Sequence, residues 1–372
     1  MNPESRDERF MRRALDLAVQ GLGRVEPNPM VGAVVVRGER IVGEGYHAQF
    51  GGPHAEVVAL EQAGAAARGA ELFVSLEPCC HHGKTPPCTD AIVAAGVRRV
   101  VAAVRDPFPQ VAGRGLAILQ EAGLEVKADV LATDARRAGA AYFKRQATGL
   151  PLVTAKWAMS LDGRLTAASA ESRWISCEAS RRRVHELRRV SDAVLVGAVT
   201  ARLDQPSLTV RHVEPIPERG QPTRVVLDGR LALEADREPV RSARDVPVII
   251  YTTEAALGSA LERADLLRRA GAEVVAVPQS AAGVAPEAVL RDLGKRGMSR
   301  VLVEGGAKVL RSFFSAGLVD RVMVFISPQV IGAAGRPEGA DSGALARPLV
   351  LADLAVARSG TDILIEGRAG EF

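Results

Sequence analysis

The sequence predicts a two-domain α/β protein, and three observations lead to that prediction. The chain has 372 residues, which is more than one ordinary hydrophobic core contains. Short apolar strands alternate with helical patterns along most of its length, as is typical of helices packed on both faces of a sheet. Helix-breaking residues at Thr148–Pro151 precede a new apolar strand. We therefore expect one domain over residues 1–147 and another over residues 148–372.

The first domain alternates between the two patterns at short intervals. Gly21 ends the first helical pattern, and Arg37–Arg40 has the composition of a hairpin turn between two apolar strands. The pattern predicts helices over about 4–20, 54–63, 89–95, 115–122 and 134–146, and strands over 31–36, 41–46, 71–76 and 98–104.

The second domain contains a longer series of the same kind. Its predicted strands cover 152–157, 193–197, 224–228, 246–251, 273–277, 300–304, 321–326 and 362–366. Its predicted helices cover 178–189, 260–270, 286–296 and 307–316. Segments 211–223 and 333–348 are rich in Pro, Gly and polar residues and are expected to be loops. We find no internal repeat, so the two domains are expected to differ in fold.

Charge and aromatic content limit the classes of partner. The formal net charge is +4, from 48 basic and 44 acidic residues spread along the chain. This balance suits a phosphorylated small substrate or an anionic cofactor and does not require nucleic acid. Aromatic residues make up only 4% of the chain, which argues against a platform for stacked bases. We therefore expect a small-molecule substrate and no nucleic-acid partner.

The N-terminus is charged and helical in pattern, so we expect no signal peptide. No stretch approaches the roughly 20 apolar residues of a membrane helix, so we expect no membrane association. Three of the four cysteines, Cys79, Cys80 and Cys88, lie within ten positions. In a chain without a secretion signal, such clustering favours metal binding over disulfides. A cytoplasmic location is expected.

The most specific local pattern combines metal ligands with a carboxylate. Pro53-His54-Ala55-Glu56 is followed by Glu77-Pro78-Cys79 and then by Cys88. One imidazole and two thiolates are zinc ligands, and a catalytic zinc site keeps its fourth position for water. The metal lowers the pKa of that water towards neutrality. Glu56, two residues after His54, can take a proton from the water and pass it to a departing amine, as hydrolytic deamination requires.

Each of these residues also has a structural interpretation. Taken alone, His54 is more often a surface or capping histidine, and Glu56 a solvated helix carboxylate. The cysteines alone can instead form a structural zinc site, the less frequent case, which normally closes with four protein ligands. Cys80, His81 and His82 are candidates for that fourth ligand. The His-x-Glu and Pro-Cys segments occur together, each at the start of a predicted helix, and this favours catalysis.

The arrangement resembles the His-x-Glu and Pro-Cys-x-x-Cys signature of zinc-dependent nucleoside and base deaminases. It departs from that signature because eight residues, 80–87, separate the two cysteines. Together with 27–29, 45–47, 81–88 and 110–115, the segments look like those of the bifunctional deaminase/reductase family of riboflavin biosynthesis. This resemblance covers nearly the whole chain, and its motifs are specific.

For the first domain, the resemblance implies a cytidine-deaminase-like three-layer α/β/α fold. The reaction implied is deamination of a diaminopyrimidinone that carries a ribosylamino 5′-phosphate. The family's zinc ligands fall on His54, Cys79 and Cys88, and its proton shuttle falls on Glu56. Substrate contacts fall on matching segments: Asn28, His47, Lys84 and Asp106.

Two residues of the first domain depart from the family pattern. Cys80 stands where serine is usual, and Phe108 stands where asparagine is usual. The first departure bears on which cysteine binds the metal, and we assign Cys79 because it directly follows the proline. The second departure, Phe108, leaves undecided which group makes the substrate contact at that position. Lys84 offers a point charge for a phosphate, although a solvated loop lysine is the alternative.

The second domain has one feature that suggests a nucleotide site without any resemblance. An apolar strand, Arg300–Glu304, leads into Gly305-Gly306 and a helix, whose first N–H groups can hold a phosphate. Two glycines after a strand are more often only a tight turn. The Gly-x-Gly-x-x-Gly fingerprint is missing, which argues against a Rossmann domain.

Segments 156–164, 172–176, 192–197, 206–211 and 303–306 look like the family's reductase domain. The resemblance implies a dihydrofolate-reductase-like α/β fold with NADPH as hydride donor. The reaction implied is reduction of the ribosyl C1′ to a ribityl chain, for which the domain must position the nicotinamide against that carbon. It also implies a homodimer.

The implied reductase sites fall into two groups. The cofactor-binding positions are Ala158, Trp174, Thr200, Asp204, Gly306, Ala307, Lys308, Val309, Leu310, Arg311 and Ser312. The substrate-binding positions are Lys156, Ser172, Arg188, Leu208, Arg211 and Glu304.

Several of these side chains also make chemical sense on their own. Arg188 and Arg211 suit a substrate phosphate as forked donors, although either taken singly is more often a surface arginine. Lys156 and Asp162 are expected to be polar walls of the site or a buried ion pair. Gln205 replaces a frequent aspartate, which leaves the polarity of its loop open, and Cys177 receives no role.

Two other functions remain open from the sequence alone. The first is a zinc deaminase that acts on a base in RNA or DNA, which would need stacking aromatics and a basic groove. The second is a non-catalytic zinc module joined to a nucleotide-binding domain. Such a module would tolerate the loss of Glu56, whereas the enzyme would not.

Overall fold

The computed structural model describes residues 4–165, 174–214, 220–281, 283–332 and 348–372. The chain divides into two compact units, Met1–Gly149 and Leu150–Phe372. Gly149 ends the last helix of the first unit in the left-handed conformation, with φ of 73°. Glycine adopts this conformation without the steric cost that a side chain imposes, which explains its place at the junction.

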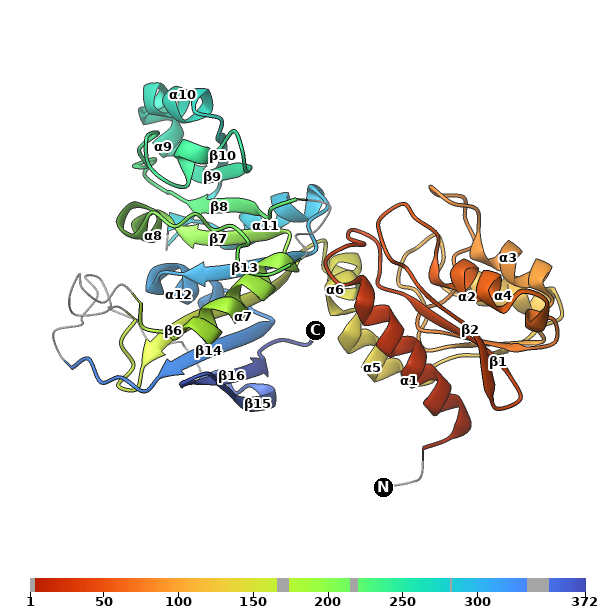
Figure 1. The fold of residues 1–372 in the computed structure, drawn as a ribbon. Helices are drawn as coiled ribbons and strands as arrows, with labels where there is room; N and C mark the ends of the chain where they lie inside the picture. Colours follow the sequence, from red (N-terminus) through yellow and green to blue (C-terminus); the bar gives the residue numbers. More distant parts are fainter. Residues whose placement is uncertain (1–3, 166–173, 215–219, 282, 333–347) are drawn as a thin grey trace. The chain divides into compact units, whose positions relative to one another are not determined.

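A five-stranded sheet forms the centre of the first unit (Figure 1). In the order β2-β1-β3-β4-β5, it contains β1 (Gly32–Arg37), β2 (Arg40–Tyr46), β3 (Glu71–Val74), β4 (Arg99–Ala102) and β5 (Glu125–Lys127). β1 is antiparallel to β2 and β3, whereas β3, β4 and β5 are parallel. The carboxyl ends of β3 and β4 therefore meet at one edge of the sheet, where the loops that carry Cys79 and Asp106 begin.

Helices cover both faces of this sheet (Figure 1). One face packs on α1 (Arg6–Ala18), α5 (Ala132–Ala138) and α6 (Ala140–Thr148), and the other on α2 (Ala55–Ala63), α3 (Cys88–Ala95) and α4 (Arg114–Glu121). Side chains of a strand alternate between the two faces. In β3, Phe73 accordingly lies in the core with α1, and Leu72 lies in the core with α2. The result is the predicted three-layer unit.

The predicted helix over 134–146 is in fact two helices. α5 ends at Ala138 and α6 begins at Ala140, with Gly139 between them at φ −86° and ψ 13°. A Cβ on Gly139 would lie 3.0 Å from the Phe143 ring, so the close packing at this joint favours glycine. The helical periodicity continues across the joint, which is why the sequence pattern did not reveal it.

A nine-stranded sheet forms the centre of the second unit (Figure 1). In the order β10-β9-β8-β7-β13-β6-β14-β16-β15, it contains β6 (Leu152–Ser160), β7 (Ala193–Gly197), β8 (Thr223–Leu227), β9 (Val248–Thr253), β10 (Glu273–Val277), β13 (Arg300–Gly305), β14 (Arg321–Ser327), β15 (Ala352–Ser359) and β16 (Asp362–Arg368). The strands from β10 to β14 are parallel. β16 and β15 continue the sheet in antiparallel pairing.

Helices lie on both faces of the second sheet as well. α11 (Pro286–Lys295) and α12 (Ala307–Ser315) cover one face, and α8 (Ala198–Asp204) and α10 (Leu261–Arg269) cover the other. α7 (Glu178–Arg189) packs through Val184 on Met323 and Phe325 of β14. The short elements α9 (Glu254–Ser259), β11 (Gln279–Ser280), β12 (Gly283–Val284) and a 3-10 helix, Val240–Ser242, complete this unit among the described residues.

The predicted helices and strands of the second unit are present, with ends that shift by up to three residues. Six α-helices and strands among the described residues were not predicted: β5, α8, α9, β11, β12 and β15. The predicted loop 211–223 is irregular where it is described, up to Thr223, where β8 begins, and most of the loop 333–348 lies outside the described residues. In the described part of the chain, no helix is long and apolar enough to cross a membrane.

Candidate active sites

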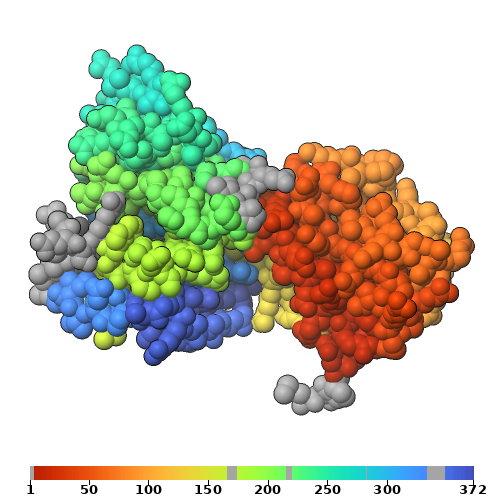
Figure 2. All heavy atoms as spheres, viewed as in Figure 1, coloured from red at the N-terminus to blue at the C-terminus, as the bar shows by residue number. Residues whose placement is uncertain are grey.

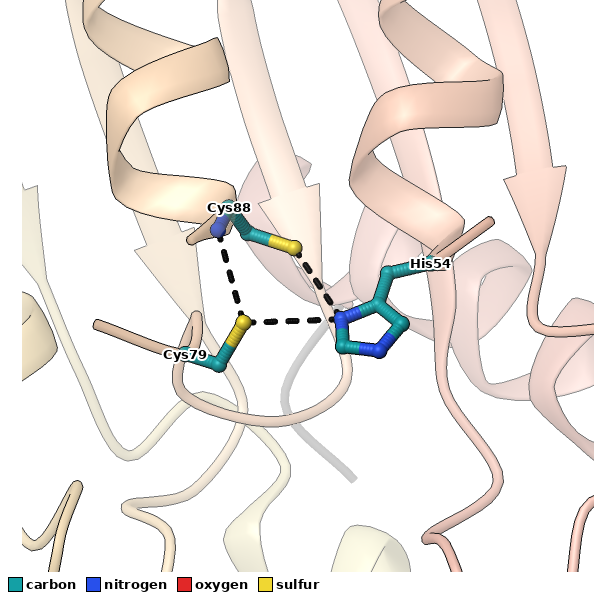
Figure 3. Close-up of side chains that lie close together, drawn as sticks. All are labelled: His54, Cys79 and Cys88. Atoms are coloured by element: carbon teal, nitrogen blue, oxygen red, sulfur yellow. Dashed lines mark hydrogen bonds between the residues drawn. The ribbon is translucent and has the colours of Figure 1, made fainter. Parts of the chain in front are cut away.

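Three side chains of the first unit converge on one point (Figure 3). His54 is the N-cap residue of α2, Cys88 is the first residue of α3, and Cys79 lies in the loop after β3. His54 Nδ1 lies 3.2 Å from Cys88 Sγ and 3.5 Å from Cys79 Sγ. The three ligand atoms all lie within 4.8 Å of one another. Two helix starts and one strand end thus place the three donor atoms around a common centre.

The donor set fits a zinc ion. Cys88 is buried, and its backbone N–H donates to Cys79 Sγ at 3.4 Å, which favours a thiolate at Cys79. Hydrogen bonds from Cys88 and His54 hold the pKa of Cys79 below its usual range. The proton shared with Cys79, together with burial, raises the pKa of Cys88. One nitrogen and two sulfurs leave a fourth tetrahedral position, as in catalytic zinc sites.

The possible fourth protein ligands do not join this centre. Within the described residues, the group able to hold a metal consists of His54, Cys79 and Cys88. The Cys80 thiol instead donates to the Gln110 carbonyl at 3.6 Å. His81 packs its ring against Phe108, with the ring centroids 5.6 Å apart. The geometry therefore favours the open, catalytic type of site over the closed, structural type.

Glu56 lies in the first turn of α2 with 3% of its surface exposed. Burial raises its pKa to about 7, and the negative charge of Cys79 acts in the same direction. A carboxyl group with a pKa near neutrality both accepts and returns a proton at physiological pH. This is the property that a proton shuttle needs.

Hydrogen bonds define the ring orientations of two histidines beside the metal centre. His47 Nδ1 lies 2.9 Å from the Pro53 carbonyl, so this nitrogen carries the proton, and Nε2 accepts from the Asn28 amide at 3.3 Å. His54 presents Nδ1 to the sulfurs, and its Nε2 lies 3.4 Å from Thr85 Oγ1. A metal-binding histidine commonly donates from its other nitrogen in this way. The sequence motif contains Thr85, but its spacing did not reveal this role.

Asp106, a second buried carboxylate of the first unit, accepts hydrogen bonds from two different segments. Tyr142 of α6 donates to Asp106 Oδ1 at 2.7 Å, and the Phe108 N–H donates to the same oxygen at 2.9 Å. Burial raises the pKa of Asp106. The Asp106 backbone N–H donates to Glu77 Oε2 at 3.1 Å. Neither Tyr142 nor Glu77 was identified from the sequence, because nothing in a pattern shows which carboxylate a distant hydroxyl reaches.

Lys84 is exposed, and its ammonium lies 3.8 Å from the centroid of the Phe50 ring. A cation above an aromatic face is attracted by the ring quadrupole. Phe50 is itself 43% exposed, so the contact lies at the surface. The structure therefore gives Lys84 a defined resting position and leaves its charge accessible to an anion.

The cofactor positions expected in the second unit gather at the carboxyl ends of neighbouring strands. Gly306 follows β13 directly and caps α12, and Thr200 lies in α8 after the adjacent strand β7. A Cβ on Gly306 would lie 2.9 Å from Thr200 Oγ1, so the two segments are close neighbours. Gly305 and Gly306 have φ of 117° and 67°, which glycine adopts readily. Ligands of parallel sheets bind at such strand ends.

The other expected cofactor positions are distributed around these strand ends. Ala158 lies in β6, the strand next to β13, and Asp204 is the last residue of α8. Trp174 is 56% exposed, with the Arg181 guanidinium 5.2 Å from its ring centroid. The positions Ala307, Lys308, Val309, Leu310, Arg311 and Ser312 all lie in the first part of α12. Ser172 lies outside the described residues.

A buried charge cluster joins Lys156 in the middle of β6, Glu304 near the end of β13 and Arg188 near the end of α7. The Arg188 guanidinium binds both oxygens of Glu304, with Nη2 to Oε2 at 2.9 Å. Lys156 Nζ lies 3.9 Å from Glu304 Oε2. Burial acts to raise the pKa of Glu304, but the charges of Arg188 and Lys156 outweigh it, so the pKa is lowered. Burial lowers the pKa of Lys156.

Lys156 therefore pairs with Glu304 and not with Asp162. Asp162 instead accepts from Ser160 Oγ at 2.6 Å and from the backbone N–H groups of Ile331 and Gly332 at 3.1 and 2.7 Å. These bonds lower the pKa of Asp162 to about 2. Asp162 thus ties the end of β6 to the segment after β14.

The segment from Leu208 to Arg211 runs beside this charge cluster. Leu208 is buried with φ of 54°, and Arg188 Nη1 donates to the Thr209 carbonyl at 3.0 Å. His185 of α7 lies within hydrogen-bonding distance of Thr209 and of Arg211. Sequence reasoning assigned no role to His185, since a histidine within a helix pattern gives no signal of its own.

Comparisons with known proteins agree with this geometry. Residues 4–104 match the model of the cytidine and deoxycytidylate deaminase zinc-binding region. Residues 151–365 match the model of the RibD C-terminal domain. The two matched regions correspond to the two units of the structure.

Curated relatives match along most of their length. The riboflavin biosynthesis protein RibD of Aquifex aeolicus is 42% identical over 326 residues, which cover 88% of both chains. The protein of the same name from Escherichia coli is 40% identical over 339 residues, which cover 89% of this chain and 90% of the relative.

Two solved structures are similar to the whole chain. RibD of Acinetobacter baumannii superposes with a TM-score of 0.84 and 36% identity, covering 98% of this chain and 99% of the other. The diaminohydroxyphosphoribosylaminopyrimidine deaminase/5-amino-6-(5-phosphoribosylamino)uracil reductase of Thermotoga maritima gives a TM-score of 0.80 and 37% identity over the same shares.

The expected fold class is thereby confirmed, as are the expected activities and the expected cofactors, zinc and NADPH. The pyrimidine small-molecule substrate class agrees with these relatives. With both of its units matched and identity near 40% over most of its length, the chain belongs to the RibD family of bifunctional enzymes of riboflavin biosynthesis, with a zinc-dependent deaminase domain followed by an NADPH-dependent reductase domain.

Proposed function

We propose that the first unit deaminates 2,5-diamino-6-ribosylamino-4(3H)-pyrimidinone 5′-phosphate and that the second reduces the ribosyl C1′ of the product to a ribitylamino chain. The observation that carries the deaminase assignment is the position of Glu56, buried in the first turn of α2 two residues after His54. A buried carboxyl group with a pKa of about 7 serves proton transfer and adds nothing that a structural metal site needs.

In the deaminase, we assign the metal to His54 Nδ1 and to the sulfurs of Cys79 and Cys88. Zinc held there supplies a water whose pKa is lowered towards neutrality. Glu56 takes a proton at its carboxylate and returns it to the departing amine as ammonia forms. Thr85 holds the His54 ring through Nε2.

The same proposal assigns four contacts to the substrate of the deaminase. Asn28 and His47, bonded to each other, present polar groups to the pyrimidine. Asp106 presents the carboxylate oxygen that Tyr142 and Phe108 leave open. Lys84 leaves the Phe50 ring to meet the phosphate as a point charge.

In the reductase, we assign the phosphates of the cofactor to the start of α12 after Gly306, where the first backbone N–H groups of the helix can bind an anion. NADPH supplies the hydride. Lys156 and Glu304 form the polar wall beside the ribosyl carbon. The Arg188 fork is already engaged by Glu304, so we assign the substrate phosphate to the exposed Arg211.

One experiment tests both assignments. The purified protein receives the phosphorylated diaminopyrimidine with or without NADPH, and both products are followed by mass spectrometry. Without NADPH we expect only the deaminated product, and with NADPH the ribitylamino product. Glu56→Gln should keep its zinc and lose about 10²-fold or more of ammonia release. The exposed neighbour in the same helix, Glu61→Gln, should keep both; near-normal turnover of Glu56→Gln would remove the shuttle from the proposal.

We also propose that the enzyme is a homodimer joined through the edge of the reductase sheet, and that it is cytoplasmic. β15 ends the sheet, and its dark-blue segment lies at the surface in Figure 2. Seven of its eight residues are exposed, among them Leu354 and Val356 at 60% and 62%. An open strand edge with apolar side chains is a surface that proteins normally cover. The four cysteines are free, which suits a reducing compartment. Val356→Lys should shift sedimentation towards monomer; an unchanged monomer–dimer equilibrium would place the interface elsewhere.

A further inference from the structure

The segment from Leu208 to Arg211 has no regular secondary structure, yet side chains from outside it bond its backbone. Gln221 pairs with both polar groups of Val210, accepting from N–H at 2.6 Å and donating to C=O at 3.2 Å. Arg188 donates to the Thr209 carbonyl at 3.0 Å. His185 Nδ1 lies 3.1 Å from this carbonyl and 3.1 Å from the Arg211 N–H. Neighbouring side chains therefore define the shape of the segment.

The two contacts of His185 Nδ1 require opposite chemistry. A protonated Nδ1 donates to the Thr209 carbonyl, whereas an unprotonated Nδ1 accepts from the Arg211 N–H. The Thr209 carbonyl already has a donor in Arg188. In the described part of the chain, the Arg211 N–H has His185 alone as an acceptor. Because a backbone N–H can only donate, and the Arg211 N–H points at Nδ1, the proton lies on Nε2 and Nδ1 accepts from Arg211.

The surroundings of His185 keep its ring neutral, as an acceptor must be. The side chain is 8% exposed. Burial, followed by the positive charges of Arg188 and Arg211, lowers its pKa to about 4, although Glu304 acts in the opposite direction. The His212 ring packs edge-on against it, with centroids 5.6 Å apart.

We propose that His185 is a positioning residue of the reductase, whose unprotonated Nδ1 holds the Arg211 backbone so that the Arg211 guanidinium meets the substrate phosphate. The inference rests on the proposed role of Arg211 and extends it to a residue that does not touch the substrate. His185 lies in α7, whereas Leu208 and Arg211 lie in an irregular segment. A rigid helix thus fixes a loop that has no secondary structure of its own.

The hydrogen bond is tested directly in the full chain by amide exchange at Arg211, followed by NMR. His185→Leu removes the acceptor and keeps an apolar side chain of similar size, whereas His185→Asn keeps an acceptor oxygen near the place of Nδ1. We expect the Arg211 amide to lose protection in the leucine variant and to keep most of it in the asparagine variant. Nitrogen-15 shifts of the wild-type ring should show an unprotonated Nδ1. Equal protection in all three proteins, or a proton on Nδ1, overturns the proposal.

Kinetics test the positioning role. In His185→Leu we expect the reductase KM for the phosphorylated substrate to rise about threefold to tenfold, as the loss of one hydrogen bond allows. The reductase kcat should change by less than about twofold, because the bond supports binding and not the hydride step. His185→Asn should restore most of the KM. The deaminase of the same chain is the internal control and should keep its KM and kcat.

Three outcomes separate this inference from the proposed function. If Arg211→Ala leaves the substrate KM unchanged, the assignment of Arg211 to the phosphate is wrong, while the exchange measurement still decides the hydrogen bond. If Arg211→Ala raises KM but His185→Leu does not, the positioning role is wrong. If His212→Leu, which keeps the Nδ1 bond, removes Arg211 protection as fully as His185→Leu, ring packing and not the hydrogen bond holds the segment, and the inference is also wrong.

Discussion

Glu77 Oε2 accepts a hydrogen bond from the Asp106 backbone N–H at 3.1 Å, which joins the loop of the proposed metal ligand Cys79 to the loop of a proposed substrate contact. The same carboxylate accepts from the N–H groups of Gly113 at 3.0 Å and Leu116 at 3.2 Å. Glu77 is 3% exposed. One buried carboxylate therefore organises three separate points of the 106–116 segment around the metal site.

Replacing Glu77 with Gln should destabilise the deaminase unit. The amide presents one acceptor oxygen and one NH₂ group, and the NH₂ group would face a backbone N–H that the carboxylate now accepts. A buried donor left without a partner costs about 1–3 kcal/mol. We expect the free energy of unfolding to fall by about that amount in urea titrations followed by circular dichroism.

Glu121→Gln is the matched control for this substitution, because Glu121 is an exposed carboxylate at the end of α4. Surface changes of this kind usually alter stability by less than about 0.5 kcal/mol. Tryptophan fluorescence gives a second control, since Trp157 and Trp174 both lie in the reductase unit. Equal unfolding curves for the two variants would mean that the Glu77 bonds contribute little to stability.

Gly115→Ala should weaken zinc binding without touching a ligand. A Cβ at this position would lie 2.1 Å from the Pro78 carbonyl and 3.3 Å from Glu77 Oε1, so α4 or the Pro78–Cys79 segment must move. Changes beside a metal site commonly cost about 10–100-fold in metal affinity. Competition with a chromogenic chelator measures the zinc Kd. Gly258→Ala, where a Cβ meets no atom within 4 Å, should leave the Kd unchanged; a wild-type Kd in Gly115→Ala would show that the loop absorbs the shift.

Gly306→Ala should weaken NADPH binding. Its φ of 67° and ψ of 140° lie in a region that is nearly restricted to glycine, and a side chain there costs about 1–3 kcal/mol. The added Cβ would also lie 2.9 Å from Thr200 Oγ1. We expect the NADPH Kd, from fluorescence titration, to rise about tenfold or more, with Gly258→Ala as control. A Kd within about twofold of wild type would move the cofactor phosphates away from the start of α12.

The sequence predicted elements best where burial gives the apolar residues a regular pattern. Strand β7 matches its predicted range because it is buried throughout and forms a short continuous apolar run, and helix α7 matches because its buried residues follow the helical period. β15 was missed because nearly all of its residues are exposed, so no alternation marks it. α8 was missed because Val199 and Leu203 are exposed, which blurs the helical pattern.

The residues of the candidate sites also differ in how well the sequence predicts them. His54, Glu56, Cys79 and Cys88 lie near helix starts and a strand end, where a short motif determines their surroundings. Contacts between distant segments have no such signal. Arg188 and Glu304 are 116 residues apart, and nothing in either neighbourhood shows that they form an ion pair. His185 gives no signal for the same reason, since its role depends on a segment with no secondary structure of its own.

The lowered pKa of His185 predicts a specific loss of stability in acid. The ordinary pKa of histidine is 6.5, and the pKa of His185 in the folded protein is about 4. Between these pH values the unfolded chain binds a proton at His185 and the native chain does not. The neutral His185 ring therefore contributes its full share of the free energy of unfolding above about pH 6.5, and this share is lost as the pH falls towards 4. Allowing for partial solvent screening, we expect about 1–2 kcal/mol. The unfolding free energy of the reductase unit, followed by tryptophan fluorescence, should fall more steeply from pH 7 to 4 in wild type than in His185→Asn. Parallel curves would show that the ring is protonated equally easily in both states.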